Sequence, residues 1–115
     1  MLEKRAFKRL TTEGEVVIKP KDGTSRVIVT DLVDVSFVGL GVISKEPIEI
    51  ERNIEIELKS QFWDEPIVAE GKVKHLQKIE KSEYNFFRMG IELTNVNQKT
   101  MRNFINRVRM NISPQ

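Results

Sequence analysis

The stretch Asn53-Ile54-Glu55-Ile56-Glu57-Leu58-Lys59 alternates between polar and apolar residues along its whole length. Successive side chains of a β-strand point to opposite faces of the sheet, so this pattern is typical of a strand with one face in a core and the other in water. The inward side chains would be Ile54, Ile56 and Leu58. The stretch therefore predicts that this part of the chain belongs to a β-sheet.

Further strand signals lie on both sides of this stretch. Residues 15–19 and 25–35 are rich in β-branched side chains, and Pro20-Lys21-Asp22-Gly23 between them is a turn signal. The two runs are therefore expected to form a hairpin. The remaining strand signals are residues 39–43, 67–76 and 84–93.

Six strands at roughly ten-residue spacing indicate a sandwich or a small barrel. Gly71 and Gly90 fall inside two of the strands, where a glycine is typical of the bulges or bends that a closing barrel needs. We predict a mainly β fold, a six-stranded antiparallel β-barrel.

The pattern changes its period near the end of the chain. Asn97 is a suitable N-cap, Pro114 comes after the stop, and between them lies an apolar stripe at helical spacing: Met101, Phe104, Ile105, Val108 and Ile112. This predicts an amphipathic helix of about fourteen residues. We expect its stripe to pack on the end of the barrel rather than on a partner or a membrane.

The composition fits one globular domain spanning all 115 residues, with 39% hydrophobic and 31% charged residues. We divide it into a flexible N-terminal arm (1–12), the barrel (13–94) and a helical C-terminus (95–115). The first ten residues lack the apolar segment of a secretory signal, and no run is long enough for a membrane helix. We therefore expect a cytoplasmic protein without membrane insertion.

Several chemistries are excluded by residue type. The chain has no cysteine and one histidine, so disulfides, thiolate metal sites, a cysteine nucleophile and a histidine-rich metal site are all ruled out. Cations are concentrated at the two ends, with an acidic middle between them. This distribution favours a locally bound anion over a broad nucleic-acid surface.

Two short motifs are candidates for such a site. Arg5 and Arg9 form R-x-x-x-R in the arm, while Asp34, Ser36 and Gly39 form D-x-S-x-x-G at the corner between two predicted strands. Each motif alone is weak, because a basic tail is commonly solvated and a polar corner is commonly only a turn. We hypothesise that the scaffold brings the two together.

With both motifs in this order and in this β context, the sequence resembles the PilZ domain family over essentially its whole length. A glycine in the last strand, here Gly90, and a C-terminal helix add to the resemblance. PilZ domains are bacterial receptors for the second messenger cyclic di-GMP. The resemblance implies a split-barrel fold and cyclic di-GMP as the ligand, with no cofactor or metal.

The resemblance also assigns roles. Arg5 and Arg9 would bind the phosphates and the Hoogsteen edge of guanine, for which a planar two-donor fork is suited and a lysine is not. Asp34 would accept from the guanine N1–H and exocyclic amine. Ser36 would add a hydroxyl hydrogen bond, and Gly39 would leave room for the base.

Four further positions are open. Lys4 is either a second cation for a stacked ligand dimer or a solvated side chain, and His75 either stacks on the ligand or is an exposed strand residue. Val38 stands where many relatives have a second glycine, so the corner either differs there or has ordinary β geometry. Trp63 is expected in the core or at its rim.

Three functions compete at this point. The first is a cyclic di-GMP receptor that changes conformation on binding and signals to an effector protein. The second is a ligand-independent PilZ-like interaction module. The third, a barrel that binds RNA or single-stranded DNA, is disfavoured because aromatic residues are only 7% of the chain. No enzyme activity is expected, because no paired acid and base are placed for catalysis.

Overall fold

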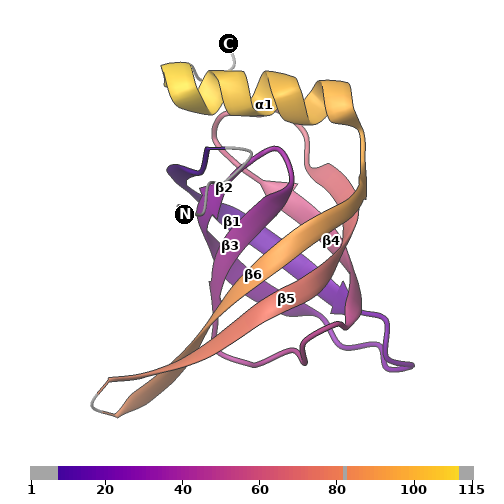
Figure 1. Ribbon diagram of the computed structural model, residues 1–115, viewed down its shortest axis with the longest axis vertical. Helices are drawn as coiled ribbons and strands as arrows, with labels where there is room; N and C mark the ends of the chain where they lie inside the picture. The colour runs from indigo at the N-terminus through magenta and orange to yellow at the C-terminus, as the bar shows by residue number, and fades with distance from the viewer. Residues whose placement is uncertain (1–7, 82, 112–115) are drawn as a thin grey trace, which may run out of the picture.

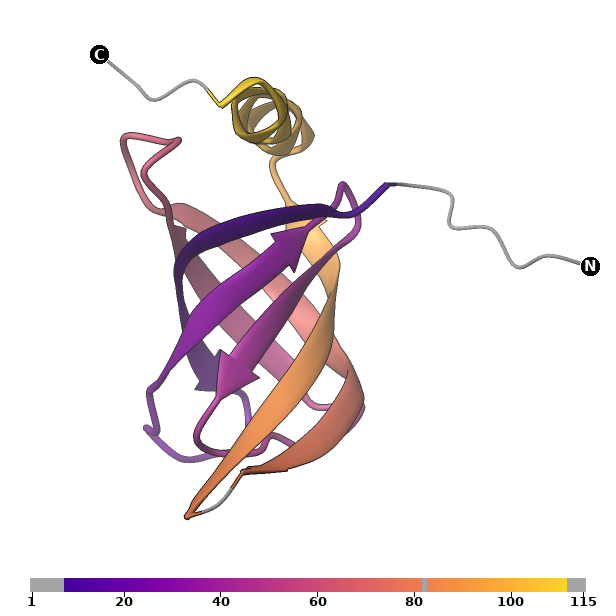
Figure 2. The same ribbon diagram turned by 90° about the vertical axis from the view of Figure 1, so that its left-hand side faces the viewer.

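Six strands and one helix make up the part of the chain that the computed structural model describes, residues 8–81 and 83–111. The elements in chain order are β1 (Leu10–Pro20), β2 (Ile28–Val35), β3 (Gly39–Ser44), β4 (Asn53–Lys59), β5 (Ile67–Lys81), β6 (Tyr84–Val96) and α1 (Gln98–Met110). Figures 1 and 2 show the strands wound into a barrel, with α1 lying across one end.

The barrel is closed in the order β1-β2-β3-β6-β5-β4, and all neighbouring strands are antiparallel. The predicted hairpin of β1 and β2 is confirmed, with Val17 opposite Val29. The pairing of β1 with β4, which places Ile18 opposite Ile56, completes the ring. The prediction of a six-stranded antiparallel barrel is therefore confirmed.

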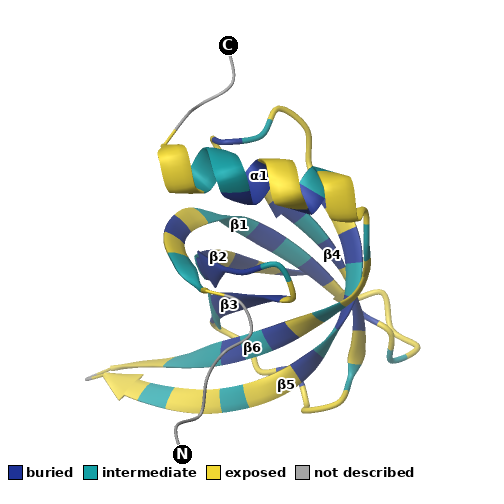
Figure 3. Ribbon diagram, turned by 45° about the horizontal axis from the view of Figure 1, so that its top comes forward, coloured by how far each residue is buried: buried dark blue, intermediate teal, exposed yellow. Residues whose placement is uncertain are grey.

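The core lies inside the ring and follows the alternation of the strands. Ile54, Ile56 and Leu58 are buried as predicted, while Asn53, Glu55 and Lys59 of the same strand are exposed. Figure 3 shows the result as alternating buried and exposed bands along the strands. The alternation of apolar and polar residues in the sequence thus matches the alternation of inward and outward side chains along the strands of the barrel.

Helix α1 covers one end of this core. Asn97 is the N-cap, and its Oδ1 accepts a hydrogen bond from the Thr100 backbone N–H at 2.9 Å. Met101, Phe104 and Ile105 are buried under the helix, which confirms the predicted packing on the barrel; Ile112 lies outside the described residues. Trp63 packs at the edge of the core with the Arg107 guanidinium 4.7 Å from its ring centre, as a rim residue would.

Gly71 and Gly90, the two glycines predicted to mark bulges, lie beside irregularities in the β5–β6 pairing. The β5–β6 register shifts between Glu70 and Gly71 and again between Val73 and His75, the latter residue pairing with Gly90. A Cβ at Gly71 would come within 2.6 Å of the Glu92 carbonyl oxygen. These bulges bend the long hairpin around the barrel, as expected from the glycine positions.

Several element boundaries differ from the sequence analysis, three of them by extending a strand beyond its predicted end or into the predicted arm. β1 begins at Leu10, inside the range assigned to the arm, because Leu10 pairs with Val35 and packs on the core. β6 continues to Val96, past the boundary placed at residue 94. β5 continues to Lys81 because its last residues pair with β6, and this part of the hairpin projects beyond the barrel (Figure 1).

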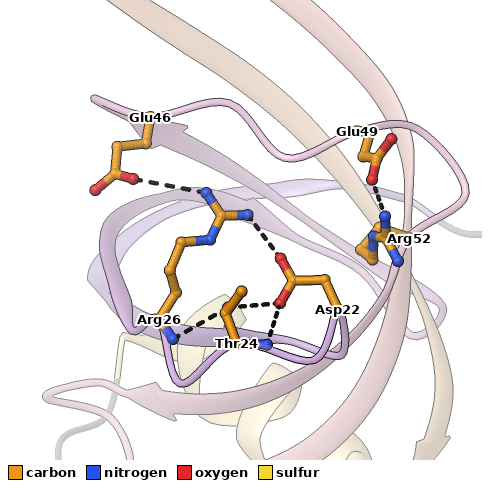
Figure 4. Close-up of polar contacts among 6 residues, drawn as sticks. All are labelled: Asp22, Thr24, Arg26, Glu46, Glu49 and Arg52. Carbon is orange, nitrogen blue, oxygen red and sulfur yellow. Dashed lines mark hydrogen bonds and ion pairs between the residues drawn. The ribbon is translucent and has the colours of Figure 1, made fainter.

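The predicted turn at residues 20–23 lies at the opposite end from α1 and is held by polar contacts (Figure 4). The Thr24 hydroxyl donates to Asp22 Oδ1 at 2.6 Å, and Arg26 contacts both Asp22 at 3.2 Å and Glu46 at 3.8 Å. These hydrogen bonds, chiefly those from Thr24, lower the pKa of Asp22. Gly23 has a φ of 84°, which a glycine adopts without strain.

Candidate ligand-binding site

Asp34 is the centre of the candidate site. Its side chain is 13% exposed, and Arg9 donates to its Oδ1 at 2.6 Å while Arg88 donates to its Oδ2 at 3.1 Å. We call Arg9, Asp34 and Arg88 the Asp34 cluster. Both arginine side chains are more exposed than that of Asp34, so the cluster opens to solvent on the outside of the barrel.

The strands explain why these three residues meet. Asp34 pairs with Thr11 at the start of β1, and Arg9, two residues before Thr11, reaches diagonally across to the Asp34 carboxylate. The register of β2 against β3 shifts between Leu32 and Asp34, and the Asp34 carboxylate lies against Gly41. Arg9 and Asp34, one residue from each motif, are thus in contact across 25 positions.

Arg88 is a site residue that the sequence analysis missed. It lies in β6, 54 positions after Asp34, and pairs with Ile43 of β3. No local pattern marks it, because only the register of β3 against β6 shows that it faces the same side as Asp34. An arginine two residues before the predicted Gly90 bulge is the sole signal that the sequence offers.

Two glycines form a strip of bare backbone beside the cluster. Gly41 pairs with Asp34 on one side and with Gly90 on the other, and Gly90 pairs with His75. A Cβ at Gly41 would come within 2.5 Å of Asp34 Oδ1, and one at Gly90 within 3.1 Å of the His75 ring. The exposed His75 therefore lies in one row with Asp34 across four strands, with the two glycines between them.

The corner that follows Asp34 is held by hydrogen bonds among its own residues, Ser36 to Gly39. The Ser36 backbone N–H donates to the Gly39 carbonyl at 2.9 Å, and the buried Ser36 hydroxyl accepts from the Val38 N–H at 3.3 Å. A Cβ at Gly39 would lie 2.6 Å from the Ile91 carbonyl oxygen, so packing against β6 already requires a glycine there. Among the described non-glycine residues only Glu51 and Asn111 have positive φ, so Val38 has ordinary geometry.

The other predicted site residues cannot be placed. Lys4 and Arg5 lie outside the described residues, so their part in the site stays a prediction. Within residues 8–81 and 83–111 there is no group of three or more histidine, aspartate or glutamate side chains that could hold a metal ion. The same residues contain no helix of the length and apolar character needed to cross a bilayer.

The fold and the cluster define a small antiparallel β-barrel domain with a paired carboxylate on its outer wall. The chain belongs to the PilZ domain family, whose model matches residues 3–109. This confirms the resemblance seen in the sequence. Comparison with curated proteins finds no match.

Solved structures with the same fold include three named proteins. MrkH of K. pneumonia in complex with c-di-GMP superposes with a TM-score of 0.79 at 12% identity, covering 96% of this chain and 54% of that one. The PilZ domain of YcgR from Escherichia coli with c-di-GMP gives 0.76 at 13% identity, covering 95% and 94%. The Bacillus subtilis inhibitor of motility MotI/DgrA gives 0.73 at 18% identity, covering 96% and 53%. The chain thus spans about half the length of MrkH and MotI but nearly all of the YcgR domain.

Proposed function

We propose that this PilZ domain is a receptor for cyclic di-GMP and that the ligand binds on the outer wall around Asp34. One observation carries the proposal: Arg9 of R-x-x-x-R and Asp34 of D-x-S-x-x-G are in direct contact at 2.6 Å. The family match and the c-di-GMP complexes of YcgR and MrkH support it.

The ligand would enter by exchanging partners with the Asp34 cluster. A guanine offers N1–H and an exocyclic amine to Asp34, so Arg9 can leave the carboxylate and turn to the phosphate or to guanine O6 and N7. Arg88 stays on Oδ2, which keeps the largely buried carboxylate paired during the exchange. Arg5 would supply the second guanidinium.

The remaining residues complete the proposed contacts. The Ser36 oxygen already accepts from Val38, which leaves its hydroxyl proton to donate to the ligand. Gly39 would leave the base room beside the corner, in addition to its packing against β6. His75, at the far end of the glycine strip, would offer its ring to the second base, and Lys4 its charge to the phosphates.

We further propose that binding orders the N-terminal arm around the ligand and changes the surface presented to an effector protein. The Asp34 cluster consists of hydrogen-bond donors and acceptors suited to ligand recognition. We therefore propose that the domain acts as a receptor rather than as an enzyme. We propose a cytoplasmic location, where the domain would have access to cyclic di-GMP.

A second candidate is a ligand-independent interaction module. It is favoured by the finding that each carboxylate oxygen of Asp34 is paired with an arginine of the chain itself. In that case the Asp34 cluster would be a structural ion network on a surface used for protein contacts.

Calorimetric titration separates the candidates. We expect heat with cyclic di-GMP and none with GMP or a single-stranded oligonucleotide. Absence of heat with all three would favour the interaction module. Oligonucleotide binding that weakens with added salt would instead favour a nucleic-acid barrel.

A further inference from the structure

A pocket of about 360 Å³ lies between the D-x-S-x-x-G corner and the first turns of α1. Its apolar lining comes from Phe37, Val38, Leu93 and Val96, and Val38 is 48% exposed there. The polar lining includes the exposed Arg102 of α1. The pocket thus combines an apolar floor with a cation at its edge.

The charge around this pocket is one-sided. Helix α1 carries Lys99, Arg102, Arg107 and Arg109 and no acidic residue. Within the described residues none of these four side chains is in an ion pair, whereas Arg9, Arg88 and seven other cations are. Arg107 is directed at Trp63, whereas Arg102 lines the pocket and the exposed Lys99 precedes it by about one helical turn.

The pocket and the Asp34 cluster share a wall. The corner that follows Asp34 places Ser36 in the candidate ligand site and the next two residues, Phe37 and Val38, in the pocket. The Val38 carbonyl accepts from the Leu93 N–H at 2.9 Å, which ties the corner to the pocket floor. A ligand that moves Ser36 therefore also moves part of the pocket lining.

We propose that this pocket docks a segment of an effector protein that carries an apolar side chain flanked by carboxylates. The apolar side chain enters between Val38 and Leu93, and the carboxylates pair with Arg102 and Lys99. The idea that docking reports cyclic di-GMP binding rests on the proposed receptor function. The docking site itself does not, because the pocket and the charge beside it are features of the fold.

Two other kinds of occupant fit the observations less well. The apolar face of α1 packs on the barrel through Met101, Phe104 and Ile105, which leaves Met110 as the one exposed large apolar side chain in the described helix, too little for insertion into a bilayer. Single-stranded nucleic acid binds to exposed aromatic rings, and the one aromatic in the pocket, Phe37, is half-buried against the core.

The test uses the full chain labelled with nitrogen-15 and three capped pentapeptides followed by NMR. The first has a leucine between two pairs of aspartates, the second replaces the aspartates by asparagines, and the third replaces the leucine by serine. We expect the first peptide to shift the amides of Val38, Leu93 and Arg102, and the other two to bind more weakly. Arg102→Glu should weaken the first peptide by roughly tenfold.

Arg109→Glu is the matched control, because it makes the same charge change on the same helix outside the pocket lining. Equal losses in both variants, or no shift at the pocket, would overturn the docking site. Stronger shifts there with an oligothymidylate or with phosphatidylglycerol vesicles would overturn it in favour of those partners.

Calorimetry with cyclic di-GMP on the same samples keeps the two proposals apart. Arg102→Glu should bind the dinucleotide as the unmodified chain does, and saturating dinucleotide should change the affinity for the first peptide. Peptide binding without dinucleotide binding would support the docking site and reject the receptor function. Dinucleotide binding that leaves peptide affinity unchanged would overturn the read-out role.

Discussion

The carboxylate of Asp34 occupies the space that a side chain at Gly41 would need. The two residues pair across β2 and β3, and a Cβ at Gly41 would come within 2.5 Å of Asp34 Oδ1. The position of the carboxylate therefore depends on the bare backbone opposite it, as well as on its two arginine partners.

Gly41→Ala should displace this carboxylate. Asp34 would rotate away from its present contacts with Arg9 and Arg88, and we expect cyclic di-GMP affinity to fall by about tenfold, with a stability loss of about 1 kcal/mol. Calorimetry and thermal unfolding measure the two effects. Val29→Ala, at an exposed position of β2, is the control and should change neither. Full affinity in Gly41→Ala would show that the site does not use this carboxylate position.

Removing either partner from the two motifs should impair binding without unfolding the domain. We expect Arg9→Ala to lower cyclic di-GMP affinity by roughly tenfold to a hundredfold, because one bidentate contact is lost. Asp34→Asn should do the same, since an amide cannot replace both acceptor oxygens. Melting temperatures should change little, because the cluster lies outside the core. Unimpaired affinity in either variant would mean that the ligand binds elsewhere.

Arg88 should matter for ligand binding although no motif includes it. In Arg88→Ala the Asp34 carboxylate loses its partner on Oδ2, and we expect affinity for cyclic di-GMP to fall by about tenfold. Arg88→Lys keeps the charge and should recover part of the loss. Lys78→Ala, in the projecting part of the same hairpin, is the control. Equal cyclic di-GMP affinities in Arg88→Ala and the control would show that Arg88 only forms a surface ion pair with Asp34 and has no part in ligand binding.

The turn at Asp22 predicts a dependence of stability on acid pH. The hydrogen bonds from Thr24, with Arg26, lower the pKa of Asp22 from its usual 3.8. A carboxyl with a lowered folded-state pKa stabilises the fold fully above its unfolded value and progressively less as the pH falls below it. Between about pH 4 and pH 2 the melting temperature should fall more steeply for the unmodified chain than for Asp22→Asn. Asp64→Asn, an exposed loop aspartate, is the control, and identical slopes for Asp22→Asn and the unmodified chain would contradict the prediction.

The barrel could be predicted because its local signals agree with its packing. The alternation around Ile56 gives a wall strand, the Asp22–Gly23 turn gives the first hairpin, and Asn97 gives the start of the helix. The contact between Arg9 and Asp34 could be hypothesised because each belongs to a motif. In each case the residues that form the pattern or the motif lie close together in the sequence.

The rest depends on contacts between distant segments. Arg88 reaches Asp34 only through the register of β3 against β6, and nothing in its neighbourhood reveals that register. The end of β5 holds Ile79 between polar residues, a weak strand signal, and is extended because β6 pairs with it. Likewise, Leu10 belongs to the barrel because Val35 is its partner.

The ring order also has a consequence during protein synthesis. β6 lies between β3 and β5, so a nascent chain that has not yet emerged beyond β5 has unpaired edges on both of these strands. Unpaired strand edges of this kind can pair with other chains until β6 has been synthesised and fills the gap. Because the same strand carries Arg88 and Gly90, the Asp34 cluster can form only after nearly the whole domain has left the ribosome.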